Sequence, residues 1–277
     1  MADVVLVEQR GAVAWITLNR PEYRNAQNSA MTYALDRAFH DAAQDDAIRV
    51  IVLGGAGDHF SAGHDIGSPG RDIDRSFPRV GMWWDHTATS GAEGRLAREH
   101  EVYLDMALRW RDIPKPTIAM VQGACIAGGL ALAWVCDLVV AAEDAFFADP
   151  VIRMGAPGIE FFAHPWELGP RAAKELLFTG DRIDAARARD LGMVNRVVPR
   201  DLLEDETREL AEAIVQRPRM ALALTKQAVN RAQDAMGFRL GMETAFALHQ
   251  LAHAHAAEAS GDPILGQTAR TMRDEPG

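Results

Sequence analysis

A carboxylate, an imidazole and several aromatic side chains stand close together in residues 149–166. Glu160 is followed by two phenylalanines and, a few residues later, by a tryptophan, which would exclude water from its carboxyl group and raise the pKa of that group. A carboxyl group with a raised pKa suits general acid–base catalysis. His164 would share a face with Glu160 if the segment is helical, and either Asp149 or His164 could be a second proton-transfer group. Alternatively, Glu160 is only an acidic residue at the start of a helix.

A second arrangement that could do chemistry is the pair His249 and His253, whose i, i+4 spacing can place two ring nitrogens on one metal ion. A metal site usually needs a further ligand. Glu243 is the only carboxylate upstream at helical spacing. We therefore expect these histidines to lie on a surface or interface and expect no metal site.

The composition is that of an ordinary globular protein. Of 277 residues, 48% are hydrophobic and 25% charged, which argues against extensive disorder. The formal net charge of -10 disfavours nonspecific binding to nucleic acids or anionic membranes. Cys125 and Cys136 are the only cysteines, so we expect neither a disulfide framework nor a cysteine-rich zinc site. No signal peptide or long apolar run is recognisable, and we expect a cytoplasmic protein.

The periodicity of apolar residues predicts an α/β fold. Helices are expected from about residue 29 and over 95–111, 128–136, 170–178 and 184–191, and strands over 4–7, 13–18, 50–53, 117–121, 138–142 and 193–198. Residues 201–260 look almost entirely helical, with a break at 217–218. We expect a core over residues 1–200 and a helical region over 201–277. Residues 67–94 lack periodicity and contain several prolines and glycines, which is typical of a lid or a disordered insertion.

Several segments resemble signatures of the crotonase superfamily, the enoyl-CoA hydratase/isomerase family. Residues 61–66 (SAGHDI) follow an expected strand and resemble the family's A-G-x-D-[LI] loop. The K-P-x-I-A-x-(I/V)-x-G…G-G…C-D signature is matched by residues 114–123 (PKPTIAMVQG), 127–129 (AGG) and 136–137 (CD). Further matches in family order are residues 19–21 (NRP), 25–26 (NA), 179–183 (TGDRI) and 188–197. Any one of these motifs is weak, but their common order makes the resemblance strong.

The resemblance implies a crotonase-like spiral of ββα units with a C-terminal helical region that drives formation of a homotrimer or hexamer. Apolar surface for this association could come from Phe238, Met242, Phe246 and Leu248, although these side chains could equally pack on their own core. The implied ligand is an acyl-CoA thioester, bound as substrate, with no separate cofactor and no nucleic-acid or membrane partner.

The resemblance also implies an oxyanion hole made by the backbone N–H groups of His64 and Gly128. Chemistry next to a thioester passes through an enolate, whose oxygen becomes an anion, and two N–H groups aimed at it supply electrostatic stabilisation. Gly128 would begin a helix, where N–H groups lack partners and the dipole favours negative charge. By this interpretation the amide of His64 acts while its side chain has no role.

Other site residues are expected around this hole. The loop residues Ala62, Asp65 and Ile66 would line the substrate site, with Asp65 holding the loop through bonds to nearby amides. Candidates for contacts with the CoA phosphates are Arg20, Arg24 and Lys226, because phosphates call for cationic side chains. Each of these three could instead be a solvated surface charge.

The sequence departs from the family where hydratases place their two glutamates. Those positions hold Ala131 and Val151, whose alkyl side chains cannot transfer protons, so standard two-glutamate hydration is doubtful. Glu160 lies in the loop where some members, such as dienoyl-CoA isomerases, place a catalytic acid.

Two functions remain open. The first is an enoyl-CoA hydratase/isomerase-like enzyme, a lyase or isomerase that works through a stabilised enolate. The alternative is a noncatalytic acyl-CoA-binding homologue that has lost its acids.

Overall fold

A computed structural model describes residues 3–68, 72 and 75–266 of the chain. Its main feature is a six-stranded sheet in the order β1-β2-β3-β4-β6-β9. Its strands are β1 (Val5–Arg10), β2 (Val13–Leu18), β3 (Val50–Gly55), β4 (Thr117–Val121), β6 (Leu138–Ala142) and β9 (Arg196–Val198). The first two form an antiparallel hairpin, and the other neighbours pair in parallel. All six strands lie within or next to the expected ranges.

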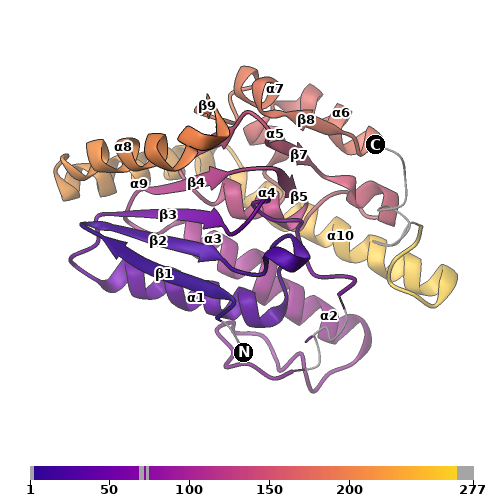
Figure 1. The fold of residues 1–277 in the computed structure, drawn as a ribbon. Coiled ribbons are helices and arrows are strands. Elements are labelled where there is room, and N and C mark those ends of the chain that lie inside the picture. Colours follow the sequence, from indigo (N-terminus) through magenta and orange to yellow (C-terminus); the bar gives the residue numbers. More distant parts are fainter. Residues whose placement is uncertain (1–2, 69–71, 73–74, 267–277) are drawn as a thin grey trace.

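A second, three-stranded sheet in the order β5-β7-β8 lies beside the first (Figure 1). Its strands are β5 (Ala124–Ile126), β7 (Phe146–Ala148) and β8 (Arg182–Asp184). These strands were not predicted, because three residues are too few for a period of two to become visible.

Helices cover both faces of the main sheet because neighbouring residues of a strand point to opposite faces. In β2, the alternate residues Ala14, Ile16 and Leu18 pack into the large core with α1 (Ser29–Gln44) and α3 (Met106–Arg111). The intervening residues, Val13 and Trp15, pack into a smaller core with α8 (Leu203–Val215).

The remaining helices complete the fold. They are α2 (Gly91–Glu99), α4 (Gly128–Trp134), α5 (His164–Glu167), α6 (Pro170–Thr179), α7 (Ala185–Asp190), α9 (Arg219–Ala235) and α10 (Phe238–Ser260). Between α2 and α3 the chain continues through a π-helical segment, His100–Asp105. The helix expected over 95–111 is therefore longer than predicted and is widened in its middle.

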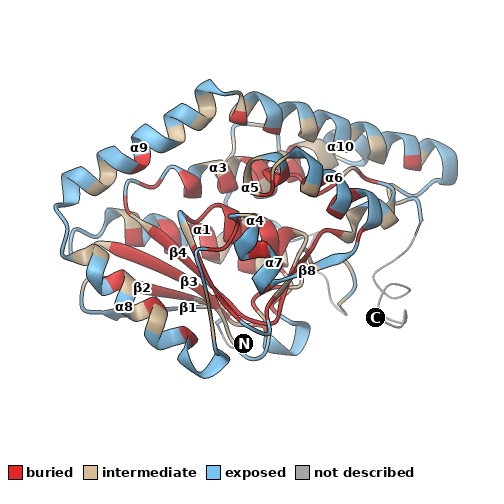
Figure 2. Ribbon diagram, turned by 90° about the horizontal axis from the view of Figure 1, so that it is seen from above, coloured by how far each residue is buried: buried red, intermediate tan, exposed pale blue. Residues whose placement is uncertain are grey.

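The C-terminal helices α9 and α10 form a long, largely exposed arm (Figure 2). Three of the four residues expected as association surface instead pack on the chain's own core: Phe238, Met242 and Phe246 are 2%, 0% and 5% exposed. Only Leu248, at 54%, is exposed. The choice between core and surface was open in the sequence, and packing decides it for the core at these three positions.

The described part of the expected insertion, residues 67–94, is mostly exposed but contacts α1. The Asp72 carboxylate accepts hydrogen bonds from the first N–H groups of α1, those of Ser29 and Ala30. Phe77 stacks on Tyr33 of α1. Helix α2 begins within the expected insertion, at Gly91.

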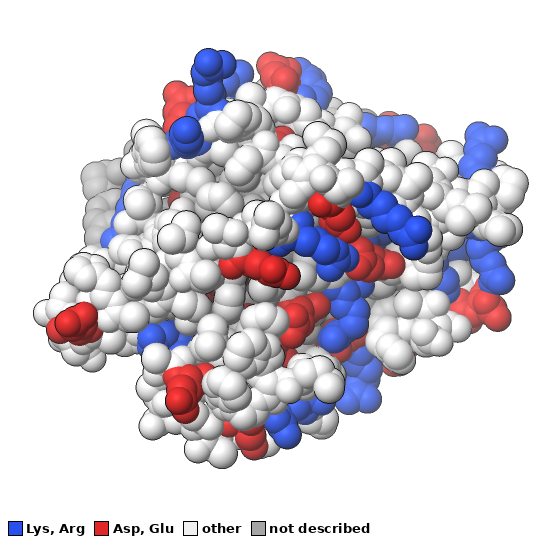
Figure 3. Space-filling view, turned by 180° about the vertical axis from the view of Figure 1, so that it is seen from behind, with Lys and Arg blue, Asp and Glu red and all other residues white. Residues whose placement is uncertain are grey.

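In the described part of the chain, no helix combines the length and the apolar character needed to cross a membrane. Acidic and basic side chains stand next to one another on the face shown in Figure 3, between broad uncharged areas. On this face the negative net charge is therefore not gathered into one acidic patch.

Candidate active site

Two loops place the residues that carry the expected N–H donors of the oxyanion hole next to one another. His64 lies in the loop after β3, and Gly128 is the first residue of α4. A Cβ atom built on Gly63 would lie 3.1 Å from the backbone nitrogen of Gly128, so the loops are in contact. Among the described residues, neither the His64 N–H nor the Gly128 N–H donates a hydrogen bond to the protein.

The loop that carries His64 is held by hydrogen bonds on both sides. Gln27 donates its N–H to Gly63 and accepts from the N–H of Asp65, at 2.8 and 3.0 Å. The Asp65 carboxylate accepts from the N–H and hydroxyl of Ser68 and from Arg20. Burial alone would raise the pKa of Asp65, but these hydrogen bonds outweigh it and lower the pKa. Asp65 thus holds the loop in the way the sequence suggested.

The side chain of His64, for which no role was expected, lies among several other site residues. Its ring stacks on that of Tyr103 with centroids 3.6 Å apart, and its Nδ1 lies 3.7 Å from Oε2 of Glu160. A Cβ atom on Gly128 would come within 2.5 Å of the imidazole ring. Burial, and after it the charge of Arg98, lower the pKa of His64 to about 3, so the ring is neutral at physiological pH.

Glu160 is buried, with 5% of its surface exposed. Its Oε1 lies 3.7 Å from Nε2 of His249, so the carboxyl group stands between two imidazoles. Burial, and after it the charge of Glu99, raise the pKa of Glu160 well above its usual value. The expectation of a common helical face with His164 is wrong, because the segment is irregular at Glu160 and α5 begins only at His164.

Asp149 and His164 form a fully buried pair, with Oδ2 and Nε2 2.9 Å apart. Asp149 also accepts hydrogen bonds from the N–H groups of Val151 and Ile159. The carboxylate therefore fixes the backbone immediately before Glu160. The Nδ1 atom of His164 has no partner in the described part of the structure.

Three residues of this region were missed in the sequence: Tyr103, His249 as a neighbour of Glu160, and Glu99. Tyr103 lies in the π-helical segment, which periodicity does not reveal. His249 was singled out only for its spacing and was expected on a surface or interface, yet it is 4% exposed and contacts Glu160. Glu99 comes from α2, so a search along the helix of His249 could not find it.

Comparison with known proteins identifies the family of the chain. The family model described as enoyl-CoA hydratase/isomerase matches residues 8–77 and 84–259. The chain belongs to the enoyl-CoA hydratase/isomerase family. EchA13 of Mycobacterium tuberculosis, named as a candidate enoyl-CoA hydratase, is 47% identical over 92% of this chain and 81% of its own length.

Solved structures of the family confirm the crotonase-like fold. A candidate enoyl-CoA hydratase from Mycobacterium smegmatis is 46% identical, with a TM-score of 0.86 over 96% of this chain and 100% of its own. An enoyl-CoA hydratase/isomerase from Xanthobacter autotrophicus Py2 is 32% identical, with a TM-score of 0.79 over 99% of each chain.

The two residues expected at the glutamate positions lie against the hydrophobic core. Ala131 and Val151 are partly buried and pack against the large core. In the loop that carries His64, Ala62 and Ile66 are also partly exposed.

Of the three cations expected at the CoA phosphates, two are internal. Arg20 is 8% exposed and binds Asp65 and the carbonyl of Ala26. Lys226 is 7% exposed, pairs with Asp137 at 2.9 Å and donates to the carbonyl of Lys115. The expected phosphate contacts of Arg20 and Lys226 are therefore corrected, because both side chains are buried and bind groups of the chain itself. Arg24 alone is exposed.

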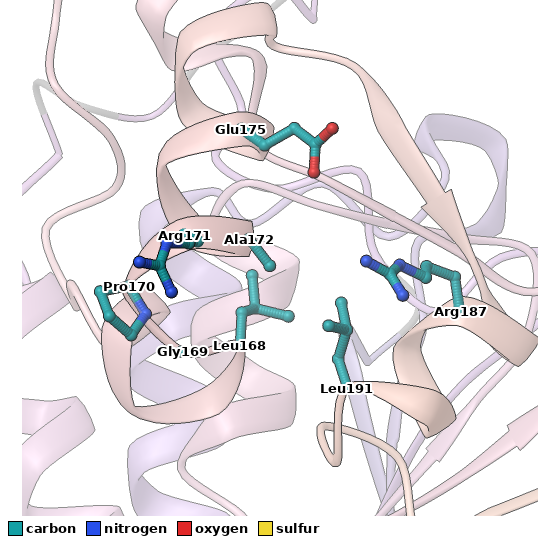
Figure 4. Close-up of a pocket in the computed structure, with 8 residues that line it drawn as sticks. All are labelled: Leu168, Gly169, Pro170, Arg171, Ala172, Glu175, Arg187 and Leu191. Atoms are coloured by element: carbon teal, nitrogen blue, oxygen red, sulfur yellow. The ribbon is translucent and has the colours of Figure 1, made fainter.

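A shallow pocket of about 340 Å³ lies elsewhere, between α6 and α7 (Figure 4). Arg187 and Leu191 face Leu168, Ala172 and Glu175 across it. None of the expected site residues lines this pocket, so it does not bring the candidate catalytic groups together.

Proposed function

We propose that this protein acts on an acyl-CoA thioester by forming an enolate, whose oxygen is held by the N–H groups of His64 and Gly128. The observation that carries the proposal is the contact between the His64 loop and the start of α4. Both N–H groups are unpaired among the described residues, and the buried carboxyl group of Glu160 lies beside the His64 ring. Preorganised donors of this kind stabilise charge that develops in the transition state. Membership of the family supports the substrate class.

Glu160 is the proposed acid–base group, in place of the glutamates replaced by Ala131 and Val151. It lies 3.7 Å from the ring of His64, the residue whose N–H is proposed for the oxyanion hole, and this nearness supports a role for the carboxyl group in the reaction. Isomerisation can run on one base, and a single carboxyl group could therefore suffice. Because burial lowers the pKa of His64 to about 3, its imidazole is a poor proton acceptor, and the acid–base role is left to the carboxyl group of Glu160.

Asp149 and His164 are proposed as positioning residues rather than as proton-transfer groups. Both side chains are fully buried and bind one another. Asp149 accepts a hydrogen bond from the N–H of Ile159, the residue before Glu160, and so holds the backbone next to the proposed catalytic group. Their geometry supports a role in holding the catalytic loop.

We further propose that Arg24 contacts the CoA phosphates, because it is the exposed member of the three candidate cations. A homotrimer or hexamer is proposed through α9 and α10. Several large apolar side chains on these helices are more than half exposed, among them Met220, Val229, Leu240 and Leu251.

The test of the catalytic role is Glu160→Gln, assayed against a panel of saturated and unsaturated acyl-CoAs. Turnover should fall by about 10²–10⁴-fold, the range typical of losing a general acid or base, while the dissociation constants of the CoA esters stay within a few-fold. Glu175→Gln changes an exposed glutamate and should leave both quantities unchanged. Undiminished turnover in Glu160→Gln would remove Glu160 from the mechanism.

The second candidate is a noncatalytic acyl-CoA-binding protein, favoured by the apolar side chains of Ala131 and Val151. The two candidates differ in whether an enolate forms. Exchange of Cα hydrogen for deuterium in saturated acyl-CoAs reports enolate formation without any later step. Binding without exchange or turnover across the panel would establish the binding-only function.

A further inference from the structure

The rings of His249 and His253 are both held in one tautomer. Nδ1 of His249 lies 2.7 Å from the carbonyl oxygen of Gly158, and Nδ1 of His253 lies 2.7 Å from that of Pro263. A carbonyl oxygen can only accept, so each Nδ1 must carry a proton. In the neutral rings, each Nε2 atom then carries a lone pair and no proton.

These two lone pairs face one another. The Nε2 atoms are 3.0 Å apart, yet neither has a proton to donate to the other. Two imidazoles in this arrangement require a cation between them, either one shared proton or a metal ion. A metal-bound histidine typically donates its other N–H to a backbone carbonyl, as both rings do here.

A carboxylate completes the group from a different helix. Oε1 of Glu99, on α2, lies 3.6 Å from Nε2 of His253, and the three ligand atoms all lie within 4.8 Å of one another. Gln250 donates to the other oxygen, Oε2, and so orients Glu99 with Oε1 toward the histidines.

The spacing fits a transition-metal ion. Zinc binds nitrogen and oxygen ligands at about 2.0–2.2 Å, so atoms that share one ion lie about 3.0–3.6 Å apart at ordinary bond angles. Two of the three distances agree with this, 3.0 Å between the two nitrogens and 3.6 Å between His253 and Glu99, while the third, between His249 and Glu99, is longer but within 4.8 Å. Two imidazoles and a carboxylate suit a borderline ion such as Zn²⁺ better than Mg²⁺ or Ca²⁺, which prefer oxygen.

We propose that His249, His253 and Glu99 form a binding site for a divalent transition-metal ion, with Zn²⁺ as its reference ligand. The ion joins α10 to α2. His249 also touches Glu160, so the metal site adjoins the catalytic carboxyl group without belonging to the proposed enolate chemistry. This proposal departs from the expectation of no metal site, which considered only carboxylates along α10.

The test uses the full chain without an affinity tag, freed of metal by a chelator. Titration with Co²⁺ should give one equivalent of binding and the visible absorption bands of a low-coordinate site, and Zn²⁺ should displace the Co²⁺. His253→Gln and Glu99→Gln should each weaken binding by more than about tenfold. The matched controls are His255→Gln and Glu93→Gln, exposed residues of the same two helices, which should bind as the unchanged protein does.

Metal binding is measured without turnover, so the experiment can reject the metal site without rejecting the enolate function, and the reverse. X-ray absorption of the Zn²⁺-loaded unchanged protein gives an answer even if a variant does not fold, because two imidazoles and a carboxylate have a distinct signature. Stoichiometric metal binding excludes a proton shared between the rings, because both would use the lone pairs of the two Nε2 atoms. Absence of Co²⁺ binding, or equal binding in His253→Gln, would overturn the proposal and leave the proton-sharing pair.

Discussion

The carboxylate of Asp149 binds His164 and the N–H of Ile159 at once, at 2.9 and 3.0 Å, and so ties a buried imidazole to the residue before Glu160. In Asp149→Asn one carboxylate oxygen becomes an NH₂ group. This group would face N–H donors and could not accept their hydrogen bonds. We expect a loss of about 1–3 kcal/mol in the free energy of unfolding, the usual cost of an unsatisfied buried group, measured by urea denaturation.

The same variant separates positioning from proton transfer. If Asp149 only positions the loop, Asp149→Asn should lower kcat while the pH profile of the remaining activity keeps its shape. A shifted profile would instead assign Asp149 a proton-transfer role. Asp201→Asn alters an exposed aspartate and should change neither stability nor rate.

The close approach of Gly128 to His64 predicts the effect of a single methyl group. In Gly128→Ala the new Cβ would lie 2.5 Å from the imidazole ring, so the ring or the start of α4 must move. Displacing one donor of an oxyanion hole typically lowers kcat by about 10²–10³-fold, and we expect a loss of this size. Gly241→Ala adds a methyl group to a helical position with no neighbour within 4 Å and should leave turnover unchanged.

The sequence predicted the scaffold better than the site. Strands such as β3 and β4 carry continuous apolar runs, and α1 has a clear stripe, so local pattern suffices for them. The strand β5 has three residues and depends on distant partners, the strand β7 and Ser61. Its position just before α4 is nevertheless what presents Gly128.

The contacts of the site escaped prediction for a related reason. The motifs placed the amide of His64, but the stacking of its ring on Tyr103 depends on a π-helical segment without a sequence signature. Likewise, Glu99 reaches His253 across two helices that are far apart in the chain. Arg20 and Lys226 were assigned to phosphate by charge alone, whereas burial pairs them with Asp65 and Asp137.

Glu167 predicts a pH dependence of stability. Burial raises its pKa from 4.5 to about 7, against the opposing charge of Arg111. Between these values the folded chain holds a proton that the unfolded chain releases, so the free energy of unfolding falls as the pH rises from about 4.5 to about 7 and then levels off.

Glu167→Gln should remove this contribution. Urea denaturation at several pH values should show a shallower decline for the variant, by at most about 1.4 kcal/mol per pH unit, and greater stability than the unchanged protein above pH 7. Glu209→Gln, at an exposed position, serves as the control. Parallel curves for Glu167→Gln and the unchanged protein would contradict the raised pKa.

The exposed apolar side chains of α10 predict self-association. Leu240 and Leu251 are 69% and 64% exposed, and a helix face of this kind gains free energy when a second copy removes it from water. Light scattering coupled to gel filtration should give the mass of a trimer or hexamer, and Leu251→Asp should lower it, because a carboxylate in an apolar contact loses its hydration. Leu202→Asp places the same charge at another exposed leucine, outside α9 and α10, and should preserve the assembly. A monomer mass for the unchanged protein, or an equal mass for Leu251→Asp, would exclude this face as the interface.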